Sequence, residues 1–268
     1  MAQQWEYDGV DLTTYAYTIR YLGAPLNVPP RRGENLVIPH KTGRGWVDKR
    51  PDQRVVTLAM WVQNVLANTG AAGGDAAMLS NLDTLRGLFA RDGQHTLKHQ
   101  YGLITRLATA EVVSEVVFEL MGKDNVYFLE VEFLLADPWW YAESATTVGP
   151  TTMTASPQNL TVTNAGSRRS EAGVFTITGQ VTNPRLTIGS YWVQYTGTVA
   201  YGQSLVINVG TFIATLAGAD VSGDITHEGG VVWLPIPAGA NTLTFTGSGL
   251  GSPPTQPTVR CVFTAPYV

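Results

Sequence analysis

Residues 125–135 read Asn125-Val-Tyr-Phe-Leu-Glu-Val-Glu-Phe-Leu-Leu135, and Asp137-Pro138-Trp139-Trp140 follows after one alanine. Apolar side chains alternate with Glu130 and Glu132 in this run, which is close to the period of two of a half-buried β-strand. Proline has no amide hydrogen to donate to a neighbouring strand, so the strand must end or lie at an edge by Pro138. The stretch therefore predicts a strand that closes a β-rich domain.

The residues before this strand predict a domain with one helix. From Asp75 to Arg91, apolar residues recur at three- and four-residue spacing, and Gly93 follows as a stop signal. We expect the Asp75 carboxylate to cap the first turn by accepting an unpaired amide. The apolar stripe of the helix needs a sheet to cover, and strand-like runs supply it at residues 14–21, 55–62, 96–101 and 103–120. The prediction is a β-sandwich-like N-terminal domain with one packed α-helix.

The charge content drops after residue 140. Only nine Asp, Glu, Lys or Arg residues lie in residues 141–268, where Thr, Gly, Val, Ala and Ser dominate. Short apolar runs separated by turn residues recur there at roughly ten-residue spacing, among them residues 174–178, 204–208 and 231–235, and this is the pattern of a β-sandwich. The fold class is therefore mostly β. The expected division is an N-terminal domain at 1–142, a small-residue, Pro-bearing linker at 143–157 and a C-terminal sandwich at 158–268.

The bulk composition excludes several function classes. A formal net charge of −4 provides no excess of cations for an open nucleic-acid-binding surface, although a narrow DNA passage is compatible with it. The single cysteine, Cys261, leaves no disulfide framework and no cysteine zinc site. The chain opens without a basic segment followed by an apolar one, and no run of about 18 apolar residues occurs. We expect synthesis in a cytosol and no membrane insertion.

No coherent catalytic constellation is found in the sequence, so we expect a non-enzymatic protein without cofactor or metal. His95 and His99 are four residues apart, but in a strand that spacing separates them by about 13 Å, too far for one metal ion. Asp220 and Asp224 lie in a Gly-rich turn, where aspartates commonly satisfy backbone amides. A calcium site or a glycosidase carboxylate pair is the alternative for these two residues.

Aromatic residues leave a carbohydrate- or receptor-binding role open for the C-terminal domain. Aromatic rings stack on sugars, but aromatic residues that alternate along strands more often belong to the core. Trp192 and Tyr195 are the sugar-binding candidates among Tyr191, Trp192, Tyr195, Tyr201 and Trp233.

The order of these features resembles the distal tail proteins of siphophages, a family of phage tail-tip hub or minor tail proteins, over essentially the whole chain. The shared features are a charged N-terminal strand domain with one helix, a strand closing on Asp-Pro-aromatic, and a Thr- and Gly-rich sandwich. The positions that carry the resemblance are Gly9-Val-Asp-Leu12, Leu79-Ser-Asn-Leu-Asp-Thr-Leu-Arg-Gly-Leu-Phe89, Phe128 to Leu135 with Asp137-Pro138-Trp139, Asn164-Ala-Gly166, Thr182-Asn-Pro184 and Ile236-Pro-Ala-Gly-Ala-Asn241.

The resemblance implies a structural virion protein at the distal end of the tail, made in the cytoplasm of a bacterial host. It implies that the N-terminal domains assemble as a hexameric ring around the channel through which DNA passes without specific binding. It also implies a galectin-like C-terminal sandwich outside the ring, and partners that include the tail tube protein and tail-associated hub, fibre, baseplate or receptor-binding proteins. The family offers no catalytic residues, and a lectin-like fold does not by itself imply sugar binding.

Overall fold

A computed structural model shows a mostly β chain that divides into two compact units between Glu143 and Ser144. The mostly β fold class and the packed helix of the N-terminal part are thereby confirmed, whereas the likeness of the C-terminal sandwich to galectins stays a prediction. The structure describes residues 3–22, 28–33, 36–37, 44–45, 50–62, 64, 73–121, 126–228 and 232–268.

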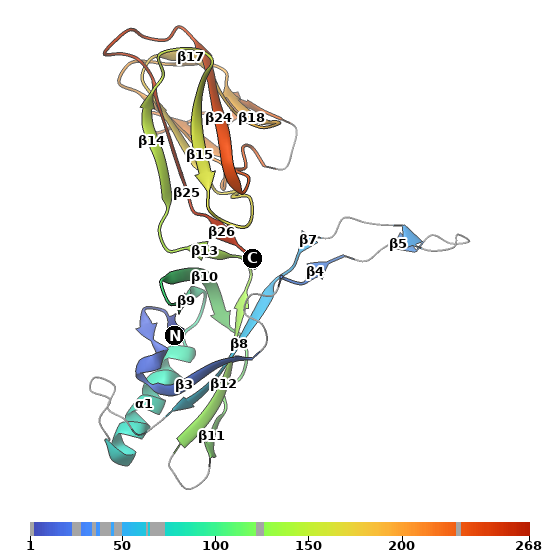
Figure 1. The fold of residues 1–268 in the computed structure, drawn as a ribbon, viewed down its shortest axis with the longest axis vertical. Helices are drawn as coiled ribbons and strands as arrows, with labels where there is room; N and C mark the ends of the chain where they lie inside the picture. The colour runs from blue at the N-terminus through green and yellow to red at the C-terminus, as the bar shows by residue number, and fades with distance from the viewer. Residues whose placement is uncertain are drawn as a thin grey trace. The chain divides into compact units, whose positions relative to one another are not determined.

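The first unit, residues 1–143, is built on antiparallel strands in the order β2-β1-β9-β10-β12-β8-β3, with β11 beside β12 and β13 beside β10 (Figure 1). Two short ladders, β4 with β7 and β5 with β6, join residues between β3 and β8. The strands are β1 (Gln3–Tyr7), β2 (Val10–Asp11), β3 (Ala16–Leu22), β4 (Arg31–Arg32), β5 (Leu36–Val37), β6 (Arg44–Gly45), β7 (Arg50–Pro51), β8 (Arg54–Val62), β9 (His95–Tyr101), β10 (Ile104–Val112), β11 (Phe118–Met121), β12 (Val126–Leu135) and β13 (Trp140–Ala142).

The strand β12 lies between β10 and β8 in this sheet. It pairs with β8 over its length, from Tyr127 opposite Val62 to Leu135 opposite Arg54. Its alternation buries Leu129, Val131 and Phe133 on one face, as the period of two predicts. Each such side chain contributes about 1.5–3 kcal/mol by leaving water. The strand ends at Leu135, before Pro138 removes a ladder amide.

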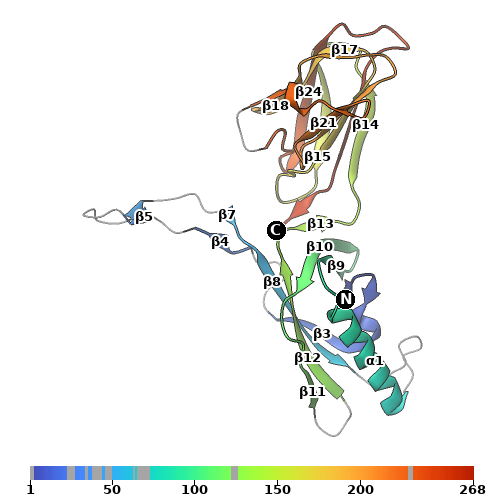
Figure 2. The ribbon, with the colours of Figure 1, turned by 180° about the vertical axis from the view of Figure 1, so that it is seen from behind.

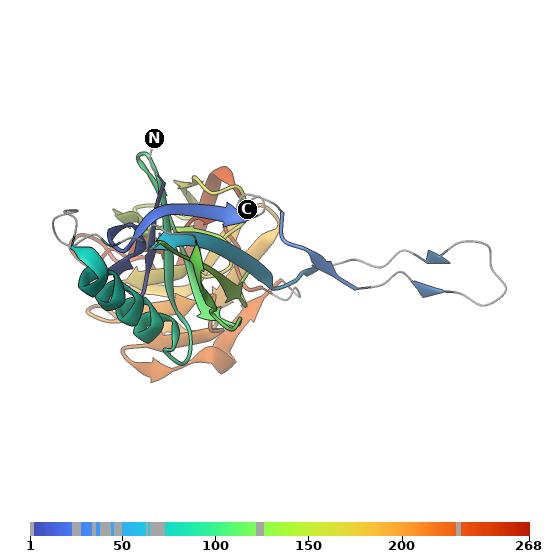
Figure 3. The same cartoon turned by 90° about the horizontal axis from the view of Figure 1, so that it is seen from below.

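The helix α1 (Gly74–Phe89) buries Leu82, Leu85, Leu88 and Phe89, and Figure 3 shows it lying beside the strands of the first unit. The Phe89 ring lies 6.3 Å from that of Tyr7 on β1 and 6.1 Å from that of Phe133 on β12. The helix therefore covers a core to which both β1 and β12 contribute side chains.

Asp75 is not the N-cap residue of this helix. The helix starts one residue earlier than expected, so Gly73 is the N-cap and has no side chain with which to cap. Asp75 instead lies in the first turn, where its negative charge faces the positive end of the helix dipole.

The second unit, residues 144–267, is a sandwich of two antiparallel sheets, seen from two sides in Figures 1 and 2. One sheet has the order β14-β25-β16-β20-β21-β22 and the other β15-β24-β17-β18-β23, with β19 beside β17. Their strands are β14 (Thr146–Thr152), β15 (Gln158–Asn164), β16 (Val174–Thr178), β17 (Val181–Ile188), β18 (Tyr191–Tyr195), β19 (Thr198–Val199), β20 (Ser204–Asn208), β21 (Ile213–Leu216), β22 (Ala219–Asp220), β23 (Ile225–His227), β24 (Gly239–Ser248) and β25 (Thr258–Phe263), and β26 (Pro266–Tyr267) follows.

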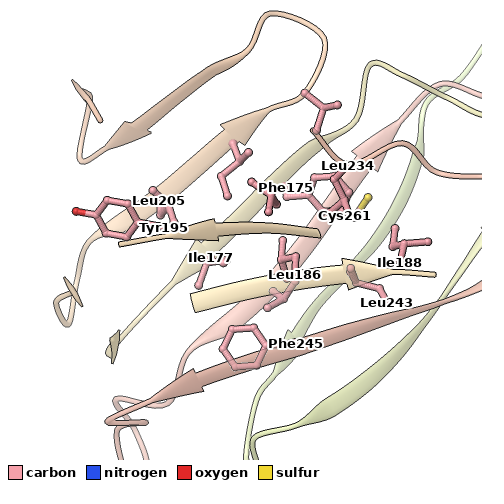
Figure 4. Close-up of a cluster of buried hydrophobic side chains, with 14 of the residues drawn as sticks. Phe175, Ile177, Leu186, Ile188, Tyr195, Leu205, Leu234, Leu243, Phe245 and Cys261 are labelled. Atoms are coloured by element: carbon pink, nitrogen blue, oxygen red, sulfur yellow. The ribbon is translucent and has the colours of Figure 1, made fainter. Parts of the chain in front are cut away.

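The two inner faces of this sandwich form one apolar core (Figure 4). Phe175 and Ile177 from β16, Leu186 from β17 and Phe245 from β24 are fully buried in it. Cys261 is 1% exposed in the same core, as a small apolar strand residue would be.

Two parts of the expected organisation differ in detail from the structure. Residues 143–157, the expected linker, contain β14, which pairs with β25 in the second unit. The sequence predicts a strand at residues 231–235, but residue 231 lies outside the described part and residues 232–234 form bends. Pro235 and Pro237 flank the isolated bridge from Ile236 to Ser170, and proline cannot donate to a ladder on either side.

Candidate functional site

The two sugar-binding candidates lie on opposite faces of one strand. Trp192 and Tyr195 are three positions apart on β18, and successive side chains of a strand alternate between faces. Tyr195 is 6% exposed and belongs to the core of the sandwich (Figure 4), whereas Trp192 is only partly buried and faces outward. The structure therefore does not bring the two residues into one site.

Trp192 lies on a polar outer face of the sheet. The Arg185 guanidinium lies 4.2 Å from the centre of the Trp192 ring, a cation–π contact worth about 0.5–1 kcal/mol at an exposed site. Thr187 is directly opposite Trp192 and Thr244 is opposite Thr187 on the next strand. This face can offer one aromatic ring and several hydroxyl groups to a ligand.

One of the two aspartates in the Gly-rich turn, Asp220, accepts a hydrogen bond from the backbone. The Asp220 carboxylate accepts hydrogen bonds from the Ser222 amide at 2.9 Å and the Ser222 hydroxyl at 2.6 Å. The Ser222 hydrogen bonds hold the pKa of Asp220 below its usual value. Asp224 lies in the short 3-10 helix that follows, Ser222–Asp224. Throughout the described residues, the structure places no three His, Cys, Asp or Glu side chains together as a metal site would need.

The two histidines of β9 have different environments. The His95 ring lies 3.2 Å from the Asp8 carboxylate through Nδ1 and 3.0 Å from the Asp92 carbonyl through Nε2. Asp8 also pairs with Arg91, just beyond the end of α1. Arg91 and His95 lower the pKa of the Asp8 carboxyl. This cluster ties the turn after β1 to the segment between α1 and β9.

His99 is buried among aromatic rings. It stacks on Trp5 with the ring centres 4.1 Å apart, and the Trp140 ring lies 6.3 Å away. Burial lowers the pKa of the His99 imidazole because the charged form loses its water. Its Nε2 atom has no hydrogen-bond partner among the described residues. The role of these aromatic residues is packing within the first unit.

The first unit also exposes two apolar patches that the alternation of the sequence did not predict. The tip patch consists of Tyr101, Leu103 and Ile104 at the β9–β10 turn, where Leu103 is fully exposed. The β11 patch consists of Val117, Leu120 and Met121. Apolar residues beside a turn glycine, as in Tyr101-Gly-Leu-Ile104, are the signal that could have revealed the tip patch, because turns lie on the surface.

Comparison with solved structures provides the decisive observation. The crystal structure of the SPP1 Dit (gp 19.1) protein, described as a paradigm of the hub adsorption apparatus in phages that infect Gram-positive bacteria, matches this chain with a TM-score of 0.70. The match covers 100% of both chains at 14% identity. The chain has the fold of that hub protein.

The other comparisons carry no further argument about the fold. Two structures of the phage P2 baseplate in its activated conformation, with Ca and with Sr, match 98% of the chain at 10% and 11% identity with TM-scores of 0.43 and 0.42. No family model and no curated relative matches the sequence. Within the part of the chain that the structure describes, no helix has the length and apolar character needed to cross a membrane.

Proposed function

We propose that this chain is a structural, non-enzymatic component of a siphophage tail tip, carried in the virion at the distal end of the tail. The observation that carries the proposal is the full-length match in fold to the SPP1 Dit protein, which includes both units and their order. Fold alone does not establish function. The match gains weight because the sequence independently resembles distal tail proteins in the order of its elements.

In this role the first unit assembles as a closed ring, which the family resemblance makes hexameric. Head-to-tail contacts between copies close into rings when the rotation between them allows it. Such contacts need two different complementary surfaces on each copy. The tip patch at the start of β10 and the β11 patch, on a strand that pairs with the first residues of β12, are two separate apolar surfaces of the first unit, and both support this kind of assembly.

The ring would surround the channel through which DNA leaves. A net charge of −4 suits a passage that does not hold the phosphate backbone, because strong binding requires neutralising cations. The tail tube protein is the expected partner on one side of the ring, and hub, fibre, baseplate or receptor-binding proteins are the expected partners on the other. Synthesis would take place in the cytoplasm of the bacterial host, before assembly.

Light scattering after size-exclusion chromatography, combined with negative-stain imaging, tests this proposal on the full chain. Closed rings are expected, either from the chain alone or on mixing with the tail tube protein from the same phage. A chain that remains monomeric alone and also with the tube protein would contradict the proposal.

A second candidate function is carbohydrate or receptor binding by the second unit. The observation that favours it is the outward-facing Trp192, which lies against Arg185 among threonine hydroxyls. A glycan array probed with the full chain tests it, with Trp192→Ala as the variant and Tyr201→Ala as the exposed aromatic control. Specific binding that Trp192→Ala abolishes would support this function, and an array without a specific signal would count against it.

A further inference from the structure

The second unit contains one sheet edge that is open along a whole strand. β15 (Gln158–Asn164) is an edge strand of its sheet and pairs with β24 on one side. Along residues 159–163 the backbone groups that face away from β24 have no partner among the described residues. Asn159, Thr161 and Thr163 are exposed on the outer face, whereas Leu160 and Val162 are buried on the inner face.

Both ends of this strand are held in place by side-chain amides. The Gln158 amide donates to the Thr152 carbonyl and accepts from the Thr154 amide. The Asn164 amide donates to the carbonyls of Arg168 and Ile236. Residues 159–163 are therefore held in an extended conformation, which lowers the entropy lost when another strand pairs with them.

Other edges of the sandwich carry features that oppose pairing. β14 has an irregular register between Val148 and Thr151 and contains Pro150. β22 is two residues long and ends in Asp220, and β23 is three residues long. Short strands, charges, prolines and bulges are the usual protection of an edge. β15 has seven residues and none of these features.

The sequence of β15 is also symmetric in polarity about its centre. Around Thr161, Leu160 corresponds to Val162, and Asn159 corresponds to Thr163. An antiparallel copy centred on Thr161 would place an apolar side chain against an apolar one on the inner face, and polar against polar on the outer face. It would bring no like charges together, and Thr–Thr pairs are favourable across strands.

We infer that the open edge of β15 pairs with the same edge of a second copy of this chain, antiparallel and about a two-fold axis at Thr161. The contact is self-complementary, as an isologous interface requires. It joins the six-stranded β15 sheets of two copies into one continuous sheet.

This contact is different from the one that would close a ring. Neighbours in a ring with only cyclic symmetry are not related by a two-fold axis. The β15 pair therefore links chains that belong to different rings or to no ring. It covers an edge that would otherwise be open to unspecific strand addition while the protein is free in solution.

Cysteine crosslinking in the full chain tests the pairing and its register. Across an antiparallel pair, directly opposed Cα atoms are about 4.5 to 5.5 Å apart, within the range of a disulfide. Thr161→Cys should therefore crosslink to itself. Thr163→Cys is the matched control, because it lies opposite Asn159 and about 14 Å from its own copy. The native Cys261 is buried, which raises its pKa to about 12, so the wild-type chain serves as the blank.

We expect Thr161→Cys to form a disulfide-linked dimer under mild oxidation roughly tenfold faster than Thr163→Cys, given the difference in distance. Equal rates for the two variants, or no dimer from either, would overturn the inference.

A second pair of variants avoids dependence on disulfide chemistry. Thr161→Lys places two positive charges face to face and should remove a two-fold species seen by light scattering, whereas Thr163→Lys should retain it. A wild-type chain without any such species also overturns the inference.

Discussion

Trp5 and His99 lie face to face on neighbouring strands, with ring centres 4.1 Å apart and planes inclined by 15°. They are directly opposite each other in the pairing of β1 with β9. Trp5 is fully buried, so an imidazole, whose unperturbed pKa lies near neutral pH, is stacked on one of the largest core residues of the first unit.

This stack predicts that acid weakens the first unit. Burial lowers the pKa of His99, so the folded state resists protonation that the unfolded chain accepts at about pH 6.5. Stability is therefore complete above that pH and decreases as the pH falls below it. His99→Phe keeps a ring on Trp5 but cannot titrate, so its unfolding temperature should change less between pH 7 and pH 5. Thermal unfolding followed by tryptophan fluorescence measures this.

His227→Gln is the control for the His99 prediction. His227 is only partly buried, at the end of β23, and its Nδ1 is 2.8 Å from the Glu228 carbonyl. This variant should keep the pH dependence of the wild-type chain. An unchanged slope in His99→Phe would show that other groups cause the acid sensitivity.

The Asp8 cluster predicts a second, lower pH window. Arg91 and His95 lower the pKa of Asp8, so the stability that Asp8 contributes is present above its unfolded pKa of about 3.9 and is lost as the pH falls through its lower folded pKa. Asp8→Asn should lower the unfolding temperature more at pH 7 than at pH 2. The effect should be modest, because these side chains are partly exposed to water.

Asp92→Asn is the matched control, since Asp92 is an exposed aspartate of the same segment. Calorimetry of both variants at the two pH values separates the cluster from a general effect of charge. Equal losses in the two variants would contradict the role given to Asp8.

The turn between β21 and β22 predicts a stabilising substitution. Ala217 has a φ of +49°, a left-handed conformation that costs a residue with a Cβ atom about 1 kcal/mol relative to glycine. Ala217 is exposed, so its methyl group contributes little packing. Ala217→Gly should raise the free energy of unfolding by about 0.5–1 kcal/mol, as measured by urea denaturation.

Ala155→Gly provides the contrast, because Ala155 is also exposed but is not among the residues with positive φ. There glycine only adds freedom to the unfolded chain, so stability should fall. A loss of stability in both variants would contradict the strain argument at Ala217.

The tip patch predicts a variant that assembles poorly but folds normally. Leu103 is fully exposed, so Leu103→Asp should leave the unfolding temperature unchanged. Burial of a leucine side chain in a contact is worth about 1.5–3 kcal/mol, so its loss should weaken ring assembly roughly ten- to hundredfold. Tyr201→Asp, an exposed residue of the second unit, should assemble like the wild-type chain. Assembly of Leu103→Asp at the wild-type concentration would exclude the tip patch from the ring contact.

The alternation of side chains along a strand accounts for much of what the sequence predicts about the fold and the candidate site. The sequence predicts strands at residues 174–178 and 204–208, and these residues form β16 and β20. The same alternation places the side chains of Trp192 and Tyr195 on opposite faces of β18, because residues three apart in a strand face opposite sides. The position of these two candidates on different faces of β18 therefore follows from their spacing alone.

Other features needed the folded chain. The exposed Leu103 and the buried Leu97 lie on the same hairpin, and only the surrounding packing decides which of them is covered. The open edge of β15 and the irregular edge of β14 likewise depend on which strands lie next to them.

The sequence by itself determined the periodicity: β-strands throughout, one amphipathic helix, a strand that ends before Pro138, and a change in composition near residue 140. These are local properties, because backbone geometry and side-chain alternation act over a few residues. Only the tertiary structure decided that β1 lies next to β9 and β8 next to β12. An alternating strand can pair with many others, and the choice among them depends on the burial of the whole core and on closure of the loops between them.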